Sequence, residues 1–194
     1  MRWWSYHFDR SHTYSLHPNG YSLVTGGLDC QVSLWDVRKF SDNRSSSKRS
    51  SNAMTPISYF QSRKSVNSAF FSPSGQYVLS TTMDNRLDLF ENMHLTKERK
   101  IQKPTTIIRH DNHTGRWLST FMAQWHPSPY HDVFSVGSMG RPRCMEVWNA
   151  SGECLRKVSG EAMTAVGSRV CFHPSIEKPI LVAGNSSGRV TIAR

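Results

Sequence analysis

Residues 14–38 read YSLHPNGYSLVTGGLDCQVSLWDVR, and residues 69–92 read AFFSPSGQYVLSTTMDNRLDLFEN in the same frame. In both segments a proline precedes an aromatic residue by 17 positions: Pro18 and Trp35, then Pro73 and Phe90. β-branched and aromatic residues fill the stretches between Pro-Asn-Gly or Pro-Ser-Gly and an aspartate-containing turn. Each segment therefore predicts three strands joined by two turns.

Two further copies of this unit follow along the chain. Residues 123–152, AQWHPSPYHDVFSVGSMGRPRCMEVWNASG, have extra residues in the second turn, and residues 170–194 read VCFHPSIEKPILVAGNSSGRVTIAR. Helix signals are nearly absent, and the polar stretch 94–103 is expected to be an exposed basic connector. Repeated strand units that cannot bury a face alone are typical of a propeller. The sequence predicts an all-β propeller of about four blades in one domain, 1–194.

The repeats are expected at about 10–38, 56–92, 104–158 and 160–194, with a flexible, basic, Ser-rich insertion at 39–55. His17, His126 and His173 each precede the repeat proline, a periodicity that indicates turns and not metal or catalysis. The segment Gly184–Gly188 lacks the lysine of a phosphate loop and is predicted to be a turn between strands.

Composition limits the classes of function. The chain has 194 residues, of which 37% are hydrophobic, and a net charge of +10. No apolar run approaches the roughly 20 residues of a membrane span, and the start lacks the pattern of a secretory signal. Four scattered cysteines form no zinc-ligand spacing and are expected to be reduced thiols of an intracellular protein. We expect no membrane association, no metal, no cofactor and no catalysis, since neither a catalytic order nor a carboxylate pair stands out.

The segments around residues 65–85, 105–127 and 161–190 carry a more specific resemblance. They read SVNSAFFSPSGQYVLSTTMDN, TTIIRHDNHTGRWLSTFMAQWHP and EAMTAVGSRVCFHP…LVAGNSSGRV. With the Trp35-Asp36 dipeptide, they resemble a family of WD-repeat DNA-damage-binding proteins. The family includes the WD repeat-containing protein 76 group, the fungal changed-mutation-rate proteins and, more distantly, the WD-repeat subunit of the damaged-DNA-binding heterodimer.

The resemblance implies a seven-bladed propeller, of which this chain holds about four blades. An isolated half would leave strand edges and one apolar blade face uncovered. We therefore expect a carboxyl-terminal portion, a truncated gene product or an incomplete gene model, with pairing of two halves as a lesser alternative. The resemblance also implies a nuclear protein that acts on chromatin in the DNA damage response.

Two interpretations of the WDVR segment, residues 35–38, remain open. In one, Trp35 packs between blades, Asp36 is satisfied within the repeat and Arg38 is a surface charge. In the other, Trp35, Asp36 and Arg38 resemble the WDxR box by which WD-repeat substrate receptors dock on the adaptor of a cullin-type ubiquitin ligase. A guanidinium just past a strand can make the bidentate contacts that such docking needs.

The loop RHDNHTGRW, residues 109–117, combines cations with a planar ring. Phosphate binding needs cations, and recognition of unpaired bases needs stacking surfaces. The candidate DNA-binding residues in this loop are Arg109, His110, His113, Arg116 and Trp117. In the alternative interpretation, Trp117 begins an interior strand and is simply buried.

Other basic positions fit a rim that faces DNA. They are Arg63 and Lys64 before a strand, Arg86 in a turn, Arg141 and Arg143 in another turn, and Arg169. Taken singly, each is more often a solvated charge, but together they predict a face that follows a phosphate backbone. The sequence thus predicts a DNA-binding protein that prefers damaged duplex, with a ligase adaptor and histones or chromatin proteins as further partners. The competing class is a protein-interaction scaffold without specific DNA binding.

Overall fold

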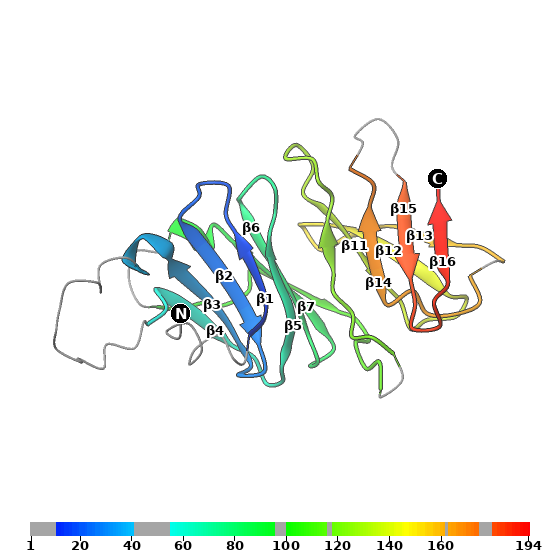
Figure 1. Cartoon of the computed structure of the whole chain (residues 1–194), viewed down its shortest axis with the longest axis horizontal. Helices are drawn as coiled ribbons and strands as arrows, with labels where there is room; N and C mark the ends of the chain where they lie inside the picture. The colour runs from blue at the N-terminus through cyan, green and yellow to red at the C-terminus, as the bar shows by residue number, and fades with distance from the viewer. Residues whose placement is uncertain (1–10, 41–54, 96–99, 116–117, 162, 175–179) are drawn as a thin grey trace.

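Short segments rich in β-branched and aromatic residues form the strands, and Gly, Asn, Asp and Pro form the turns between them. The computed structural model describes residues 11–40, 55–95, 100–115, 118–161, 163–174 and 180–194. Four separate sheets result, and in each the strands follow in chain order (Figure 1). All neighbouring strands pair antiparallel except the last pair of the first sheet, which is parallel. The predicted all-β propeller is confirmed as a partial one.

The sheets are built from sixteen strands among these residues. The first sheet holds β1 (Ser11–Leu16), β2 (Ser22–Gly27), β3 (Gln31–Asp36) and β4 (Ser58–Gln61), and β8 (Lys100–Ile101) joins β4 in parallel. The second holds β5 (Val66–Phe71), β6 (Tyr77–Thr82), β7 (Arg86–Glu91) and β9 (Thr106–Arg109). The third holds β10 (Gln124–Trp125), β11 (Val133–Gly137), β12 (Cys144–Asn149) and β13 (Cys154–Ser159). The fourth holds β14 (Arg169–Phe172), β15 (Leu181–Gly184) and β16 (Val190–Ala193).

Two single-turn 3-10 helices, η1 (Val37–Phe40) and η3 (Met93–Leu95), follow β3 and β7. Lys100 and Ile101, expected in a connector, instead extend the first sheet, because β4 leaves an edge that they can pair with. The predicted insertion 39–55 lies outside the described residues except at its two ends. Among the described residues, no helix combines the length and apolarity that crossing a membrane requires.

The repeats expected at 56–92 and 104–158 each begin with a strand, β4 and β9, that belongs to the preceding sheet. Strand β4 lies in the repeat expected at 56–92, yet it pairs with β3 of the first sheet. A strand of one repeat therefore completes the sheet of the preceding repeat, and neighbouring sheets are tied together along the chain.

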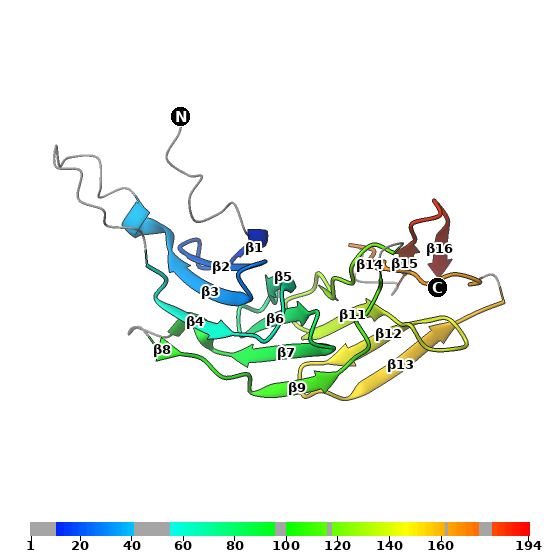
Figure 2. The same cartoon turned by 90° about the horizontal axis from the view of Figure 1, so that it is seen from below.

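Neighbouring sheets stack against one another (Figure 2). The apolar core lies between them, in three clusters. Val24 and Leu34 of the first sheet meet Val78 and Phe90 of the second in one cluster. A second cluster joins Leu79, Leu87 and Leu89 to Phe121, Phe134 and Val136. The third joins Met145 to Val170, Leu181 and Ala183. Because both faces of an inner sheet are buried, its strands are apolar on both sides.

The first strands of neighbouring sheets run side by side in the same direction. The Ala69 N–H donates to Thr13 Oγ1 over 3.0 Å, and the Phe71 N–H donates to Ser15 Oγ over 3.1 Å. Between the third and fourth sheets, Met122 and Arg169 form a parallel bridge. Equivalent strand ends of all four sheets therefore lie on the same side of the molecule.

Trp35 fits the first of the two interpretations of the WDVR segment. Its side chain is buried, and its indole N–H donates to Thr25 Oγ1 of the neighbouring strand over 3.0 Å. In the second sheet Phe90 takes the equivalent place, and the Ser80 hydroxyl below it is buried without a hydrogen-bond partner among the described residues. The tryptophan thus stabilises its own sheet, since a buried hydroxyl with a donor costs less than one without.

The histidines before the repeat prolines close turns, as their periodicity predicts. His17 Nδ1 accepts the Asn19 N–H over 2.9 Å, and His126 Nδ1 accepts the Ser128 N–H over 3.2 Å. The His126 ring also lies edge-on to Phe172 of the next sheet, with ring centroids 4.9 Å apart. Because the His126 Nδ1 accepts the Ser128 N–H, the turn requires a neutral imidazole at His126.

This requirement predicts a loss of stability in mild acid. Burial, and secondarily the nearby His131, lowers the pKa of His126 below its usual value. As the pH falls below about 6.5 the unfolded chain takes up a proton that the folded chain resists, so the free energy of unfolding decreases. We expect the urea midpoint to fall between pH 7.5 and 5.5, and to fall less in His126→Asn, whose amide oxygen can accept the same N–H. An equal fall in both proteins would exclude His126 as a source of the pH dependence.

Close backbone approach between the third and fourth sheets predicts a second stability effect. A methyl group at Gly137 would overlap the carbonyl oxygen of Gly167, which cannot move aside without shifting the backbone. Gly137→Ala should therefore lower the free energy of unfolding by about 2 kcal/mol or more, in the range of overpacking defects. Gly160→Ala is the matched control, because a methyl group there meets nothing within 4 Å. Chemical denaturation of both variants measures the difference, and equal stability would contradict the packing.

Candidate nucleic-acid interface

Strand direction gathers cations on one edge of the four sheets. We call this edge the cationic edge (lower edge of Figure 1). It is formed by the β2–β3, β6–β7, β11–β12 and β15–β16 turns and by the segments after β4, β9 and β13. Among the described residues it carries eight Arg or Lys side chains: Arg63, Lys64, Arg86, Arg109, Arg141, Arg143, Arg169 and Arg189. Four carboxylates lie on the same edge: Asp29, Asp84, Asp111 and Glu161.

The opposite edge is close to neutral by comparison. Its described turns and strand ends carry four cations, Arg38, Lys39, Lys103 and Arg194, and four carboxylate side chains, Asp36, Glu91, Asp132 and Glu153. The excess positive charge of the described chain is therefore directional, and a polyanion would be attracted to the cationic edge.

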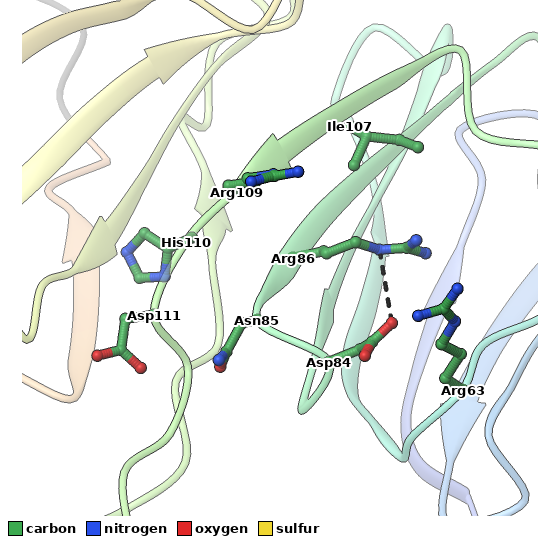
Figure 3. Close-up of a pocket in the computed structure, with 8 residues that line it drawn as sticks. All are labelled: Arg63, Asp84, Asn85, Arg86, Ile107, Arg109, His110 and Asp111. Atoms are coloured by element: carbon green, nitrogen blue, oxygen red, sulfur yellow. Dashed lines mark ion pairs between the residues drawn. The ribbon is translucent and has the colours of Figure 1, made fainter.

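Three of the predicted arginines meet at a hollow of about 630 Å³ on the cationic edge. Arg63 comes from the segment between β4 and β5, Arg86 from the start of β7, and Arg109 from the end of β9. Figure 3 shows their side chains around the hollow, each from a different segment of the chain. The other lining residues are Asp84, Asn85, Ile107, His110 and Asp111.

Arg86 is the fixed member of the three. Its Nη2 donates to Asp88 over 3.0 Å, and its Nε lies 3.9 Å from Asp84 Oδ2. Burial raises the pKa of Asp88 above its usual value, and the Arg86 guanidinium opposes that shift. The buried Arg86 Nε has no hydrogen-bond acceptor among the described residues. Removing Arg86 would leave Asp88 buried without its counter-ion, so this residue supports the fold as well as the surface.

Arg63 and Arg109 are not held in this way. Both are exposed, and neither has an ion-pair partner among the described residues. Arg109 lies opposite Arg86 in the register of β7 and β9. Arg63 and Arg109 therefore offer guanidinium groups to an external anion without first breaking an internal salt bridge.

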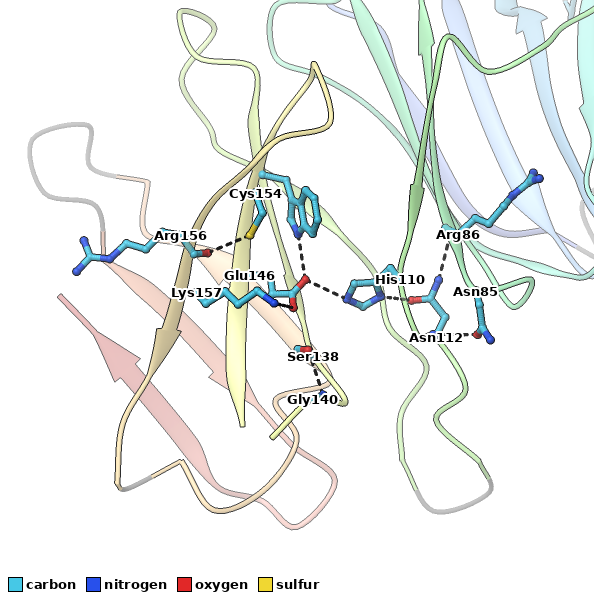
Figure 4. A network of polar contacts seen from close by, with 11 residues as sticks. Asn85, Arg86, His110, Asn112, Ser138, Gly140, Glu146, Cys154, Arg156 and Lys157 are labelled. Atoms are coloured by element: carbon cyan, nitrogen blue, oxygen red, sulfur yellow. Dashed lines mark hydrogen bonds and ion pairs between the residues drawn. The ribbon is translucent and has the colours of Figure 1, made fainter. Parts of the chain in front are cut away.

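The loop that follows β9 is tied to both neighbouring sheets through His110. The His110 ring is buried, and its Nδ1 donates to Asn112 Oδ1 over 2.7 Å. Asn112 Nδ2 in turn donates to the carbonyl oxygens of Thr82 and Arg86, over 2.8 and 3.0 Å. His110 Nε2 faces Glu146 of the third sheet at 3.7 Å (Figure 4).

The Glu146 carboxylate contacts residues from two sheets. Besides His110, it accepts the Trp148 indole N–H over 3.2 Å and pairs with Lys157 Nζ at 3.4 Å. The position of the His110 ring is thus set from inside the molecule. We assign it a positioning role for the loop and not a direct contact with phosphate.

The remaining predicted positions differ in how they present their charge. The His113 side chain is exposed, and its backbone N–H donates to Asp111 Oδ1 over 3.0 Å. Lys64 and Arg141 are exposed, whereas Arg143 donates to the Met139 carbonyl oxygen over 2.6 Å and is held in its own turn. Arg116 and Trp117 lie outside the described residues.

Sequence reasoning missed Arg189 and Ile107. Arg189 follows the Gly184–Gly188 turn as Arg86 follows the Asp84-Asn85 turn, so its place in the repeat would have revealed it. Its Nη1 donates to Thr164 Oγ1 over 2.9 Å. Ile107 lines the hollow from β9 with about half of its surface exposed, a position that only strand pairing shows.

The adaptor candidates lie on the opposite edge. The Arg38 guanidinium forms a two-point contact with Asp36, through Nε at 2.9 Å and Nη2 at 2.8 Å, and stacks 4.0 Å above the Tyr21 ring. The hydrogen bond from Arg38 lowers the pKa of Asp36 below its usual value. The Arg38 side chain is still 65% exposed. It is therefore an oriented cation on the surface, whereas Trp35 is internal.

The comparisons with known proteins agree with this architecture. The family model described as "WD domain, G-beta repeat" matches residues 5–36 and 54–91. The chain carries WD40 repeats. In this WD40 chain the matched segments contain β1 to β3 and β4 to β7, the two repeats whose sequences align most simply.

Similar proteins cover nearly all of the WD40 chain. It is 35% identical to WD repeat-containing protein 76 of Xenopus laevis over 93% of its length, and 34% identical to the Mus musculus protein of the same name over 95%. It is 30% identical to DNA damage-binding protein cmr1 of Aspergillus oryzae over 97% of its length. The predicted resemblance is confirmed. The chain spans 29%, 28% and 36% of these three relatives, which is about a third of their length.

Proposed function

We propose that this WD40 chain binds DNA through its cationic edge, prefers damaged duplex, and works in the nucleus as a chromatin-associated adaptor. The observation that carries the proposal is the segregation of eight cations to one edge, three of which share a hollow. Relatives named DNA damage-binding proteins support the choice of DNA among polyanions. No reaction is proposed, because binding by cations and planar groups accounts for the site.

Preference for damaged duplex would come from the loop after β9. Its described part places Arg109 and His113 on the surface and anchors the chain at His110. The proposed stacking residue Trp117, with Arg116, lies beyond that anchor. A loop held at its base can present a ring to an unpaired base without losing the order of the sheet.

Fluorescence anisotropy tests this proposal. It compares two matched duplexes, one intact and one with an abasic or ultraviolet lesion, across a salt series with excess undamaged competitor DNA. We expect binding that weakens steeply with salt and a lesion preference that survives competition. Arg141→Gln should flatten the slope of log affinity against log salt by about one. Lys103→Gln on the opposite edge is the control and should leave the slope unchanged.

Equal, weak binding to both duplexes that disappears near physiological salt would overturn lesion preference. It would favour the competing function, a protein-interaction scaffold whose charge attracts acidic partners. Histones or other chromatin proteins, proposed here as additional partners, would bind without regard to the lesion.

The Asp36–Arg38 pair supports a second contact, to the adaptor of a cullin-type ubiquitin ligase. The oriented guanidinium lies on the edge away from the proposed DNA site, so both partners can bind together. We propose that Arg38 makes the contact and that Trp35 only supports the strand beneath it.

Replacing Arg38 with Ala should weaken capture of the purified ligase adaptor about tenfold while DNA affinity stays the same, because a charge-assisted contact is lost at one edge only. Lys39→Ala, at the neighbouring exposed position, is the control. Equilibrium titration measures both affinities. Unchanged adaptor capture by Arg38→Ala would make the WDVR segment a feature of the sheet alone.

A further inference from the structure

The hollow formed by Arg63, Arg86 and Arg109 differs from the smaller hollow beside Arg169 on the same edge in bringing three arginine side chains together. We propose that it binds the terminal phosphate of a DNA strand, at a nick or at a duplex end, and so directs the chain to broken strands. This inference rests on the proposed DNA binding and names the kind of damage that one part of the surface recognises.

The donors in the hollow suit a terminal phosphate better than a phosphodiester. A terminal phosphate carries a charge of about −1.5 to −2 near pH 7 and three free oxygens, whereas a phosphodiester has one charge and two free oxygens. Arg63 and Arg109 have no carboxylate partner among the described residues, and Arg86, although its Nε is buried, keeps 24% of its side chain exposed. Three guanidinium groups from three different segments can therefore converge on three oxygens.

The two carboxylates in the wall restrict where the phosphate can lie. Asp84 is close to Arg86 Nε, and Asp111 accepts the His113 N–H, so each has a partner that reduces its effective charge. Both carboxylates still repel an anion that enters the hollow. A ligand must make several strong hydrogen bonds to overcome that repulsion, and this favours a phosphate with three free oxygens over one with two.

The shape of the site favours a strand end over continuous backbone. Phosphates within a duplex are flanked by sugars on both sides, whereas an end can enter a recess of about 630 Å³. Ile107, 53% exposed on β9, lines the same hollow and offers an apolar surface to the sugar or base of the last nucleotide. Because Arg86 is fixed by Asp88, this wall of the site exists before the ligand arrives.

The test uses the full chain and nicked duplexes that differ only at the nick, with a 5′-phosphate, a 3′-phosphate or hydroxyls on both sides. We expect a phosphate-bearing nick to bind about tenfold more tightly than the hydroxyl nick, a difference of about 1.4 kcal/mol at 25 °C. The two phosphate arms identify which strand end enters the hollow. Arg63→Gln and Arg109→Gln should each reduce this preference to about twofold or less.

Arg141→Gln is the matched control on the same edge, outside the hollow. It should weaken binding to all three nicks in proportion and leave the ratio between them intact. Thermal unfolding of each variant identifies any loss of folding, and two independent arginine variants keep the test decisive if one is unstable. Equal affinity for phosphate and hydroxyl nicks, or a preference that neither variant reduces, would overturn the site.

A second readout separates this inference from the proposed function. This readout examines the hollow without a duplex. The protein is titrated with thymidine 5′-monophosphate or with thymidine, and binding is monitored by the NMR signals of the arginine Nε–H groups. Shifts caused by the monophosphate alone, and lost in Arg63→Gln, would support the site even if duplex binding fails. The opposite outcome is a chain that binds duplex DNA but shows no preference for a phosphate-bearing nick and no response to the monophosphate. It would support the proposed function and exclude the hollow as a terminal-phosphate site.

Discussion

Face-to-face packing of neighbouring sheets is the constraint on which the other features of this chain depend. A four-stranded meander cannot cover its own faces, so Val24, Leu79 and Met145 are buried only because the next sheet lies against them. The contact is close enough that backbone meets backbone at Gly137 and Gly167. Sheets held in this way cannot slide along their strands, because sliding would separate each apolar cluster and expose it to water.

Alignment of the sheets has an electrostatic consequence. Since the turns after β2, β6, β11 and β15 emerge on one side, cations that are 20 or more residues apart in the chain become neighbours there. Such an arrangement is repulsive without an anion, and the molecule offsets part of the cost with Asp84 and the buried Asp88 around Arg86. Arg63 and Arg109 are left without such compensation among the described residues, which is the signature expected of groups reserved for binding.

The sequence alone predicted the fold well because each repeat is marked by residues whose structural roles are local. The Pro18 and Pro73 turns, the aspartates before the third strands and the Trp35 position recur at fixed spacing, and each has a local physical role that the structure retains. It predicted the individual cations of the rim but not their meeting, because the approach of Arg63 to Arg109 depends on the pairing of β7 with β9 and on packing between sheets. The burial of His110 was likewise beyond local signals, since its partner Glu146 comes from another sheet.

The two edges of the sheets are far enough apart to act independently. A strand of six residues such as β3 or β7 spans about 20 Å, whereas exposed charges at physiological ionic strength are screened within about 8 Å. Phosphates bound near Arg86 would therefore exert little direct field on the Arg38–Asp36 pair at the other end of the strands. Coupling between the edges would have to pass through movement of the sheets, and the apolar clusters between them resist such movement. The architecture thus suits a protein that holds DNA and a protein partner at the same time without either partner altering the affinity of the other.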